Sequence, residues 1–255
     1  MTIELVSFRY NLIAKKRLDL TINLVNQSQA DLVMFCGHTI NDQYNLDILK
    51  ERIENKTSFV LFEVKHVYES NFLNLKNCLY TIENGEIHNL FTNQIFSSSD
   101  EIKGNDALCE RFINELETRR RLKVKEKNCL VLQCGENNII KNIQKEANRA
   151  VFRLQERTDL KERFNRILNE THIILNPIHT PMGNQGKMER RREYFSADNR
   201  YYFSVSQNGT IKRNDIYYEI SMDSHRLHYA YHNGNPLEAF SSKTTKDFQV
   251  RIFDL

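Results

Sequence analysis

Cys134 is the residue whose type and position most clearly suggest chemistry. It directly follows residues 129–133, a short apolar run typical of a buried strand, and it precedes Gly135 and Glu136. A thiol at the end of a strand can act as a nucleophile, and a glycine beside it lets other backbone approach closely. A buried, inert cysteine is the structural alternative at such a position.

Three histidines form a second candidate cluster. His225, His228 and His232 are spaced H-x-x-H-x-x-x-H, which on a helix would gather them on one face and suit zinc. The surrounding residues are β-like, however, and on a strand His225 and His228 would face opposite sides. We therefore predict no metal and no other cofactor.

Two basic runs could bind phosphate groups. The first comprises Arg119, Arg120, Arg121, Lys123, Lys125 and Lys127, and the second comprises Lys187, Arg190, Arg191 and Arg192. Glutamates are interspersed with both runs, so solvated, salt-bridged surfaces are the simpler interpretation. The sequence contains neither a G-x-x-x-x-G-K-[ST] nor a G-x-G-x-x-G phosphate loop. A nucleic-acid-associated protein is thus the weakest functional hypothesis, and we do not expect a nucleic-acid partner.

Strand-like and helix-like segments alternate along the chain. We predict strands over residues 3–10, 30–35, 58–67, 129–133, 173–175 and 201–206, and helices over residues 16–25, 45–53, 107–122, 159–169 and 187–198. Asn84 and Gly85 lie between two β-type runs, which is a strong hairpin signal. The alternation predicts an α/β protein, whose sites form where strands reach their carboxyl ends.

The composition is that of a globular chain. The 255 residues include 36 Lys and Arg against 33 Asp and Glu, a net charge of +3, and 40% are hydrophobic. Only 8 glycines and 3 prolines occur, which excludes collagen-like and low-complexity classes. The apolar runs fall far short of the ~18 residues of a membrane span. Five scattered cysteines and no visible export signal predict reduced thiols in a cytoplasmic protein.

Several consecutive segments resemble the nitrilase superfamily of carbon–nitrogen hydrolases. They are residues 30–37 (ADLVMFCG), 77–87 (NCLYTIENGEI), 133–136 (QCGE), 173–177 (IILNP) and 191–205 (RREYFSADNRYYFSV). They are similar, in turn, to the family patterns a-D-L-v-v-F-P-E, N-s-l-x-x-i-x-x-G-x-i, I-C-y-D/E, l-i-l-n-P and R-x-x-A-x-E-N-x-x-y-v-v. The segments occur in the order of the family and together extend over most of the chain.

The resemblance implies a four-layer α-β-β-α sandwich, formed by residues 1–255 as a single domain that pairs into a homodimer. It also implies a Glu-Lys-Cys triad that hydrolyses amides or nitriles through an acyl-thiol intermediate. In such a triad the glutamate removes the thiol proton and the lysine stabilises the oxyanion. Cys134 matches the nucleophile, and Glu136 matches the acidic residue that follows it.

The chain departs from the family at the other two triad positions. The register of residues 30–37 puts Gly37 where the glutamate belongs, and the register of residues 91–96 puts Asn93 where the lysine belongs. The loss of both charges predicts a catalytically degenerate protein that binds or regulates a protein partner in a complex.

A repurposed thiol hydrolase is the alternative, acting on an amide or related acyl substrate. In this hypothesis His38 is the base for Cys134, and Asn93 donates a hydrogen bond to the oxyanion. Lys65 and Lys103 are further candidates for the missing cation.

Overall fold

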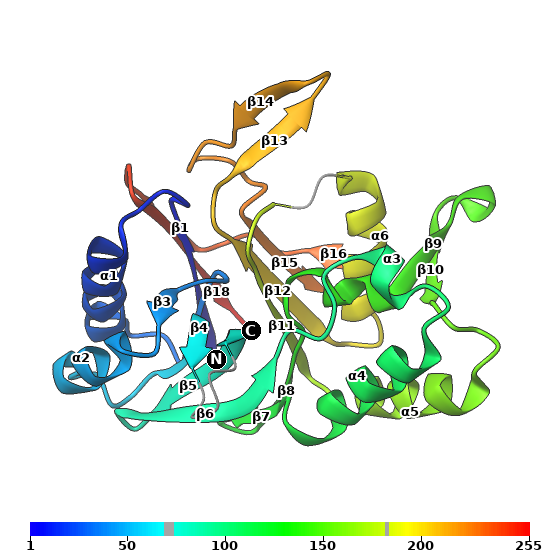
Figure 1. Ribbon diagram of the computed structural model, residues 1–255, viewed down its shortest axis with the longest axis horizontal. Helices are drawn as coiled ribbons and strands as arrows, with labels where there is room; N and C mark the ends of the chain where they lie inside the picture. Colours follow the sequence, from blue (N-terminus) through cyan, green and yellow to red (C-terminus); the bar gives the residue numbers. More distant parts are fainter. Residues whose placement is uncertain (69–73, 182–183) are drawn as a thin grey trace.

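Two β-sheets form the centre of the protein in the computed structural model, which describes residues 1–68, 74–181 and 184–255 (Figure 1). The first sheet has eight strands, in the order β17-β18-β1-β2-β4-β5-β6, with β3 paired to β4. These strands are β1 (Thr2–Phe8), β2 (Leu32–Phe35), β3 (Ile40–Asp42), β4 (Phe59–Tyr68), β5 (Asn74–Glu83), β6 (Glu86–Asn93), β17 (Ser241–Thr244) and β18 (Phe248–Asp254). At its centre, β1, β2 and β4 run parallel.

The second sheet has six strands, in the order β16-β15-β12-β11-β8-β7. They are β7 (Arg121–Val124), β8 (Lys127–Val131), β11 (Ile173–Ile178), β12 (Tyr201–Ser206), β15 (His228–His232) and β16 (Asn235–Pro236). Strands β8, β11 and β12 run parallel. Two hairpins lie outside both sheets, β9 (Ile140–Ile143) with β10 (Arg149–Phe152), and β13 (Thr210–Arg213) with β14 (Ile216–Glu219). The second of these projects from the body of the molecule (Figure 1).

Helices cover the outer faces of the two sheets (Figure 1). The helices beside the first sheet are α1 (Ala14–Gln27) and α2 (Asn45–Arg52), and those beside the second are α3 (Ser99–Ile102), α4 (Asp106–Thr118), α5 (Thr158–Asn169) and α6 (Gln185–Ser196). Short 3₁₀ helices span Cys134–Ile139 and Gln144–Glu146. The predicted α-β-β-α sandwich is therefore confirmed.

The alternation of side chains along β11 explains why four layers form. Ile173 and Leu175 belong to the core cluster that holds residues of both sheets, whereas Ile174 belongs to the cluster that includes Phe112 of α4 and Phe164 of α5. Successive strand residues point to opposite faces, so an uninterrupted apolar strand needs cover on both sides. The apolar runs of the sequence thus fix the central position of their strands.

The carboxyl ends of strands from both sheets meet at one place. The chain leaves β2 at Cys36 and Gly37, leaves β8 at Gln133 and Cys134, and leaves β11 at His179. A backbone hydrogen bond from Gly37 N–H to the carbonyl oxygen of Ile178 (3.0 Å) joins the first sheet to the second here. This junction is where a site is expected in an α/β protein.

A buried salt bridge holds the turn that carries Cys134. Arg120 and Glu136 are both 0% exposed, and the guanidinium contacts both carboxylate oxygens at 2.9 and 3.2 Å. The same carboxylate accepts the backbone N–H groups of Gln133 and Ile95. Glu136, which we predicted among the catalytic residues, is therefore engaged in the scaffold. The pair also explains why the helix predicted to reach residue 122 ends at Thr118, since Arg120 must turn inward.

Two further points concern the three histidines and the search for a membrane span. His228 is buried in β15, whereas His225 precedes the strand and His232 contacts Asn199, so the three histidines form no metal cluster among the described residues. Within the described residues, no helix is long and apolar enough to cross a membrane.

We predict that Glu136→Gln lowers the free energy of unfolding by about 3 to 5 kcal/mol, because it leaves the buried Arg120 charge uncompensated. Equilibrium urea denaturation measures the change. Glu126→Gln, which removes one partner of the exposed Lys123–Glu126 pair, is the matched control and should unfold like the wild type. Unfolding of Glu136→Gln at the wild-type midpoint would contradict the scaffolding role.

Candidate active site

Glu63 is the buried acid at the centre of the candidate site. It lies in β4 at 0% exposure, and its carboxylate accepts the backbone N–H of His38 (2.8 Å) and the Nε2–H of Gln133 (2.6 Å). Nε2 of His179 lies 2.7 Å from its Oε2. Burial alone would raise the pKa of Glu63, but the charge and hydrogen bond of His179 hold it below its usual range. Glu63 is thus a carboxylate at neutral pH.

Gly37 leaves the space that His179 occupies. A Cβ atom at Gly37 would lie 2.2 Å from Cδ2 of His179 and 3.1 Å from Oε2 of Glu63. Any side chain at this position would therefore collide with the imidazole. Where the family resemblance places a glutamate on this loop, the chain has a histidine from the end of β11 and a carboxylate from the neighbouring strand β4.

His179 connects Glu63 to Cys134. Burial opposes its protonation, but the charge of Glu63, a hydrogen bond with Cys134 and a hydrogen bond with Glu63 together raise the pKa of His179 to about 10. His179 is therefore an imidazolium at neutral pH. A cation beside a thiol favours the thiolate, which is the form that attacks carbonyl carbon. The three residues form the Cys-His-acid order of a nucleophilic triad.

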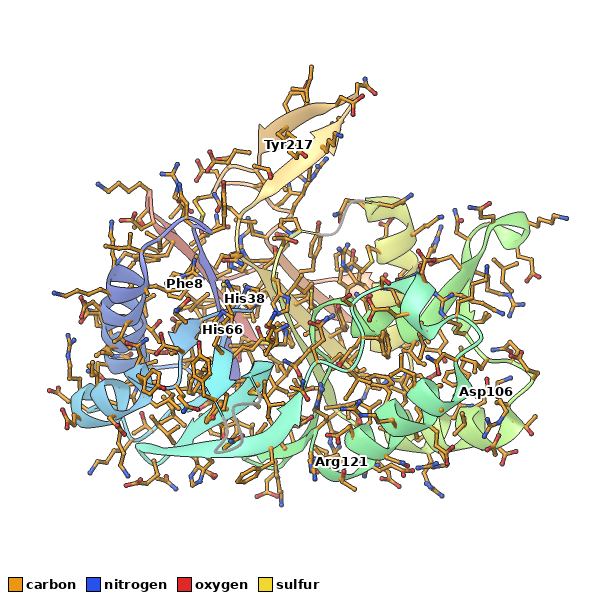
Figure 2. All side chains as sticks on the ribbon, viewed as in Figure 1. Phe8, His38, His66, Asp106, Arg121 and Tyr217 are labelled. Atoms are coloured by element: carbon orange, nitrogen blue, oxygen red, sulfur yellow. The ribbon has the colours of Figure 1, made fainter. Side chains whose placement is uncertain are left out.

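His38 lies beside His179 and not at the thiol. The two imidazoles stack with ring centroids 3.8 Å apart, and Nε2 of His38 lies 3.0 Å from Oδ1 of Asn77. Burial and then the charge of His179 lower the pKa of His38 to about 4, so its ring is neutral at pH 7. Figure 2 labels His38 near the middle of the molecule, where it is half-buried. The predicted Cys134–His38 pair is thus replaced by a Cys134–His179 pair.

Cys134 has a backbone conformation that is uncommon outside glycine. Its φ angle is 39°, and it begins the 3₁₀ helix Cys134–Ile139, directly after the strand. Such conformations persist where the surroundings impose them, and here the Glu136 carboxylate and the close approach of Ser97 to Gly135 do so. The turn presents the thiol at the end of β8.

A cavity of about 420 Å³ opens onto Cys134. Lys187 and Arg191 supply its charge, Ser97 and Asn138 are among its polar walls, and no acidic residue of the described chain lines it. Arg191 is 8% exposed, and it donates to the neutral side chains of Asn142 and Asn138. The cavity is therefore cationic.

His38, Glu63 and His179 also offer ligand atoms within 4.8 Å of one another, the spacing of a metal site. Their arrangement does not suit a metal ion, because the two imidazole rings are stacked with an interplanar angle of 17°. The lone pairs lie in the ring planes, so they run side by side and do not converge on one point. Their nitrogens are in addition already engaged with Glu63 and Asn77. A hydrogen-bonded triad accounts for these residues better than a metal centre does.

Asn93 lies at the end of β6 and does not line the cavity that opens onto Cys134. It lines a different cavity, with Thr92 and Arg119, and its backbone oxygen accepts a hydrogen bond from Arg120. This placement does not support the oxyanion role that we predicted for Asn93. Lys103 is exposed at the end of α3, and Lys65 lines a cavity that does not include Cys134.

The first basic run is largely neutralised by ion pairs. Arg119, Arg120, Arg121, Lys123 and Lys125 pair with Glu115, Glu136, Glu170, Glu126 and Asp31. Paired charges of this kind favour the solvated-surface interpretation over a nucleic-acid interface.

Sequence reasoning missed Glu63 and His179, although both carried a signal. Glu63 is the one acid in the apolar run of residues 59–64, and a charged residue in a buried strand requires a partner. His179 follows the strand that resembles the family's l-i-l-n-P segment, at a carboxyl end like that of Cys134.

Comparisons with solved structures identify the fold. An amidase from Nesterenkonia sp. AN1 superposes with a TM-score of 0.59 at 10% identity, over 100% of this chain and 92% of that one. A CN-hydrolase superfamily protein from Xanthomonas campestris gives 0.56 at 13% identity, over 100% and 90%. A glutamine-dependent NAD(+) synthetase from Cytophaga hutchinsonii gives 0.58 at 10% identity, over 100% of this chain but 43% of that one.

No protein-family model matches the sequence, and no curated protein matches it either. The resemblance is therefore one of structure at low sequence identity. The chain has the fold of the nitrilase, or CN-hydrolase, superfamily, with a cysteine at the end of a central strand.

We predict that NMR titration of the imidazole rings resolves two opposite shifts, with His179 titrating at a pH near 10 and His38 near 4. In Glu63→Gln the main group that raises the pKa of His179 is gone while burial remains, so the pKa of His179 should fall well below its wild-type value. His172→Gln and His225→Gln serve to assign the spectra. An unchanged His179 titration in Glu63→Gln would rule out the proposed charge pair.

We also predict that Gly37→Ala slows alkylation of Cys134 by iodoacetamide roughly tenfold or more, because the added methyl displaces His179. Peptide mass spectrometry at several times of reaction gives the rate. Gly186→Ala is the control, since a Cβ atom there meets its nearest neighbour at 3.9 Å. Equal alkylation rates in Gly37→Ala and wild type would show that His179 does not activate the thiol.

Proposed function

We propose that the protein is a cysteine-dependent hydrolase of amides or related acyl compounds. The observation that carries the proposal is the chain of contacts from Cys134 through the His179 imidazolium to the buried Glu63 carboxylate. These residues supply the nucleophile, the proton carrier and its orienting acid, so the chain compensates for the family glutamate that it lacks. The fold adds support, because structures that share it include amidases.

In the first half of the reaction the Cys134 thiolate attacks the carbonyl carbon of the substrate. The carbon–nitrogen bond breaks, the His179 imidazolium gives its proton to the departing amine, and the acyl group remains on sulfur as a thioester. Glu63 holds the imidazole in orientation and favours its charged form, as its 2.7 Å contact and the raised His179 pKa indicate.

In the second half a water molecule hydrolyses the thioester. Neutral His179 takes a proton from the water, the hydroxide adds to the acyl carbon, and the carboxylic acid leaves as sulfur regains its thiolate form. The backbone N–H of Gly135, the residue after the nucleophile, is the donor closest in sequence for the oxyanion. Lys187 and Arg191 place positive charge in the same cavity.

The cavity suggests which acyl compounds fit. Lys187 forms no ion pair among the described residues, and the buried Arg191 contacts only neutral acceptors in the hydrogen bonds described above. Buried cations are normally compensated by an anion. We therefore expect a substrate whose acyl part carries a carboxylate or a similar negative group.

The decisive experiment measures acyl transfer to Cys134. We expect p-nitrophenyl succinate monoester to release about one equivalent of p-nitrophenolate in a burst, with the succinyl mass on the Cys134 peptide. Cys134→Ala and His179→Ala should abolish the burst, and Glu63→Gln should slow acylation about 10²-fold or more. His38→Gln should cost less than His179→Ala, since His38 only stacks on the imidazolium.

Cys109→Ala is the matched control, because this thiol is buried in α4 and its pKa is raised to about 12 by burial. If the folded wild type acylates Cys134 no faster than Cys109, the hydrolase proposal fails. A catalytically degenerate binding or regulatory subunit, with a homodimeric or heteromeric partner, would then be the better hypothesis.

A further inference from the structure

A second cavity, of about 370 Å³, borders His38, one of the two stacked imidazoles. It is lined by Arg17, His38 and Lys65, with Tyr10, Asn41 and Gln207 completing much of its wall. His38 lines this cavity and also stacks on His179, whereas Cys134 does not line the cavity. The cavity is therefore distinct from the one that opens onto the thiol.

Arg17 is a buried cation that has no counter-ion among the residues that the structure describes. It is 7% exposed, and its terminal nitrogens donate to the carbonyl oxygens of His38, Arg9 and Tyr10 and to Oε1 of Gln207, all of them neutral acceptors. Its Nε is buried without a partner. Arginine stays charged in proteins, and a buried charge is costly unless an opposite charge lies close.

The ionisable thiol of Cys36 does not supply that opposite charge. Cys36 interacts electrostatically with Arg17, but burial raises the pKa of Cys36 to about 11, so its thiol is neutral. Among the described residues neither Arg17 nor Lys65 forms a salt bridge, and no carboxylate lines the cavity. Two positive charges thus face one small space uncompensated.

The backbone adds to this positive field. Helix α1, of 14 residues, begins at Ala14 on the wall of the cavity, its N-cap residue Ile13 makes no side-chain cap, and its first turn contains no acid. Anions are favoured at such a helix start. The start of α1 therefore adds to the positive field of Arg17 and Lys65, and these two side chains remain the main features of the site.

We propose that this second cavity binds a small dianion, such as a phosphate or a dicarboxylate, between Arg17 and Lys65. Two negative charges would balance the two cations, which the neutral hydrogen-bond acceptors around Arg17 do not. Anion binding in this cavity does not require the Cys134 thiol, so it can be tested in a protein that cannot react.

The experiment is isothermal titration of inorganic phosphate, and separately of succinate, into folded Cys134→Ala at constant ionic strength. We expect saturable binding of at least one of the two anions at one site per chain. Lys65→Glu should weaken it tenfold or more, because the substitution puts a carboxylate in the cavity. Lys76→Glu, with the same charge change at an exposed position of β5, should bind within about twofold of the parent.

Lys187→Glu distinguishes this site from the cavity beside Cys134. Anion binding lost in Lys187→Glu but kept in Lys65→Glu would place the anion at the wrong cavity and overturn the proposal. Absence of saturable binding for both anions would also overturn it. Either result leaves the hydrolase proposal untouched, since that depends on acylation of Cys134 in the wild type.

Discussion

The buried carboxylate of Glu63 is the constraint on which the architecture of the site depends. A carboxylate removed from water must be surrounded by donors, and the chain supplies them from three separate places: the loop after β2, the end of β8 and the end of β11. Because β8 and β11 belong to the second sheet and Glu63 to the first, its hydrogen bonds fasten the sheets together at their carboxyl ends. The same bonds aim His179 at Cys134, so the scaffold and the chemistry share one set of contacts.

The charges around Glu63 form a consistent set. The buried Glu63 anion stabilises the His179 cation, and burial together with that cation keeps the stacked His38 neutral. Gly37 is part of the same arrangement, since a side chain there would occupy the volume of the imidazole. The chain thus has a glycine where the family pattern has a glutamate, and its carboxylate comes from β4. In this arrangement the carboxylate acts on the thiol through a histidine instead of directly.

Much of the fold followed from local patterns in the sequence. Short continuous apolar runs indicated the central strands, three- and four-residue spacing indicated α4, and Asn84-Gly85 indicated the hairpin of β5 and β6. These signals are local because each depends on neighbours within a few residues. Residues that bind distant partners were harder to place. The helix predicted to reach residue 122 ends at Thr118, because Arg120 turns toward Glu136.

The site itself could be predicted only in part, because its partners are far apart in the chain. Cys134 was visible as the end of a strand, but the contact between Glu63 and His179 spans 116 residues and leaves no local pattern. His38 was the predicted base because it follows the glutamate position of the family pattern. Its φ of 58° places it in a turn beyond the strand, and its ring stacks on His179. Single positions can suggest which residues are able to react, whereas the pairing that makes them react depends on the fold.

The loop that follows β2 also joins the two cavities physically. Arg17 donates to the carbonyl oxygen of His38 at 2.7 Å, and the N–H of the same residue donates to Glu63 at 2.8 Å. A ligand that fixes the guanidinium therefore acts on the residue whose N–H donates to the carboxylate that orients His179. Coupling between sites requires such a shared element, and it must be reciprocal. In this fold a single residue, His38, lies between Arg17 of the second cavity and Glu63 of the triad.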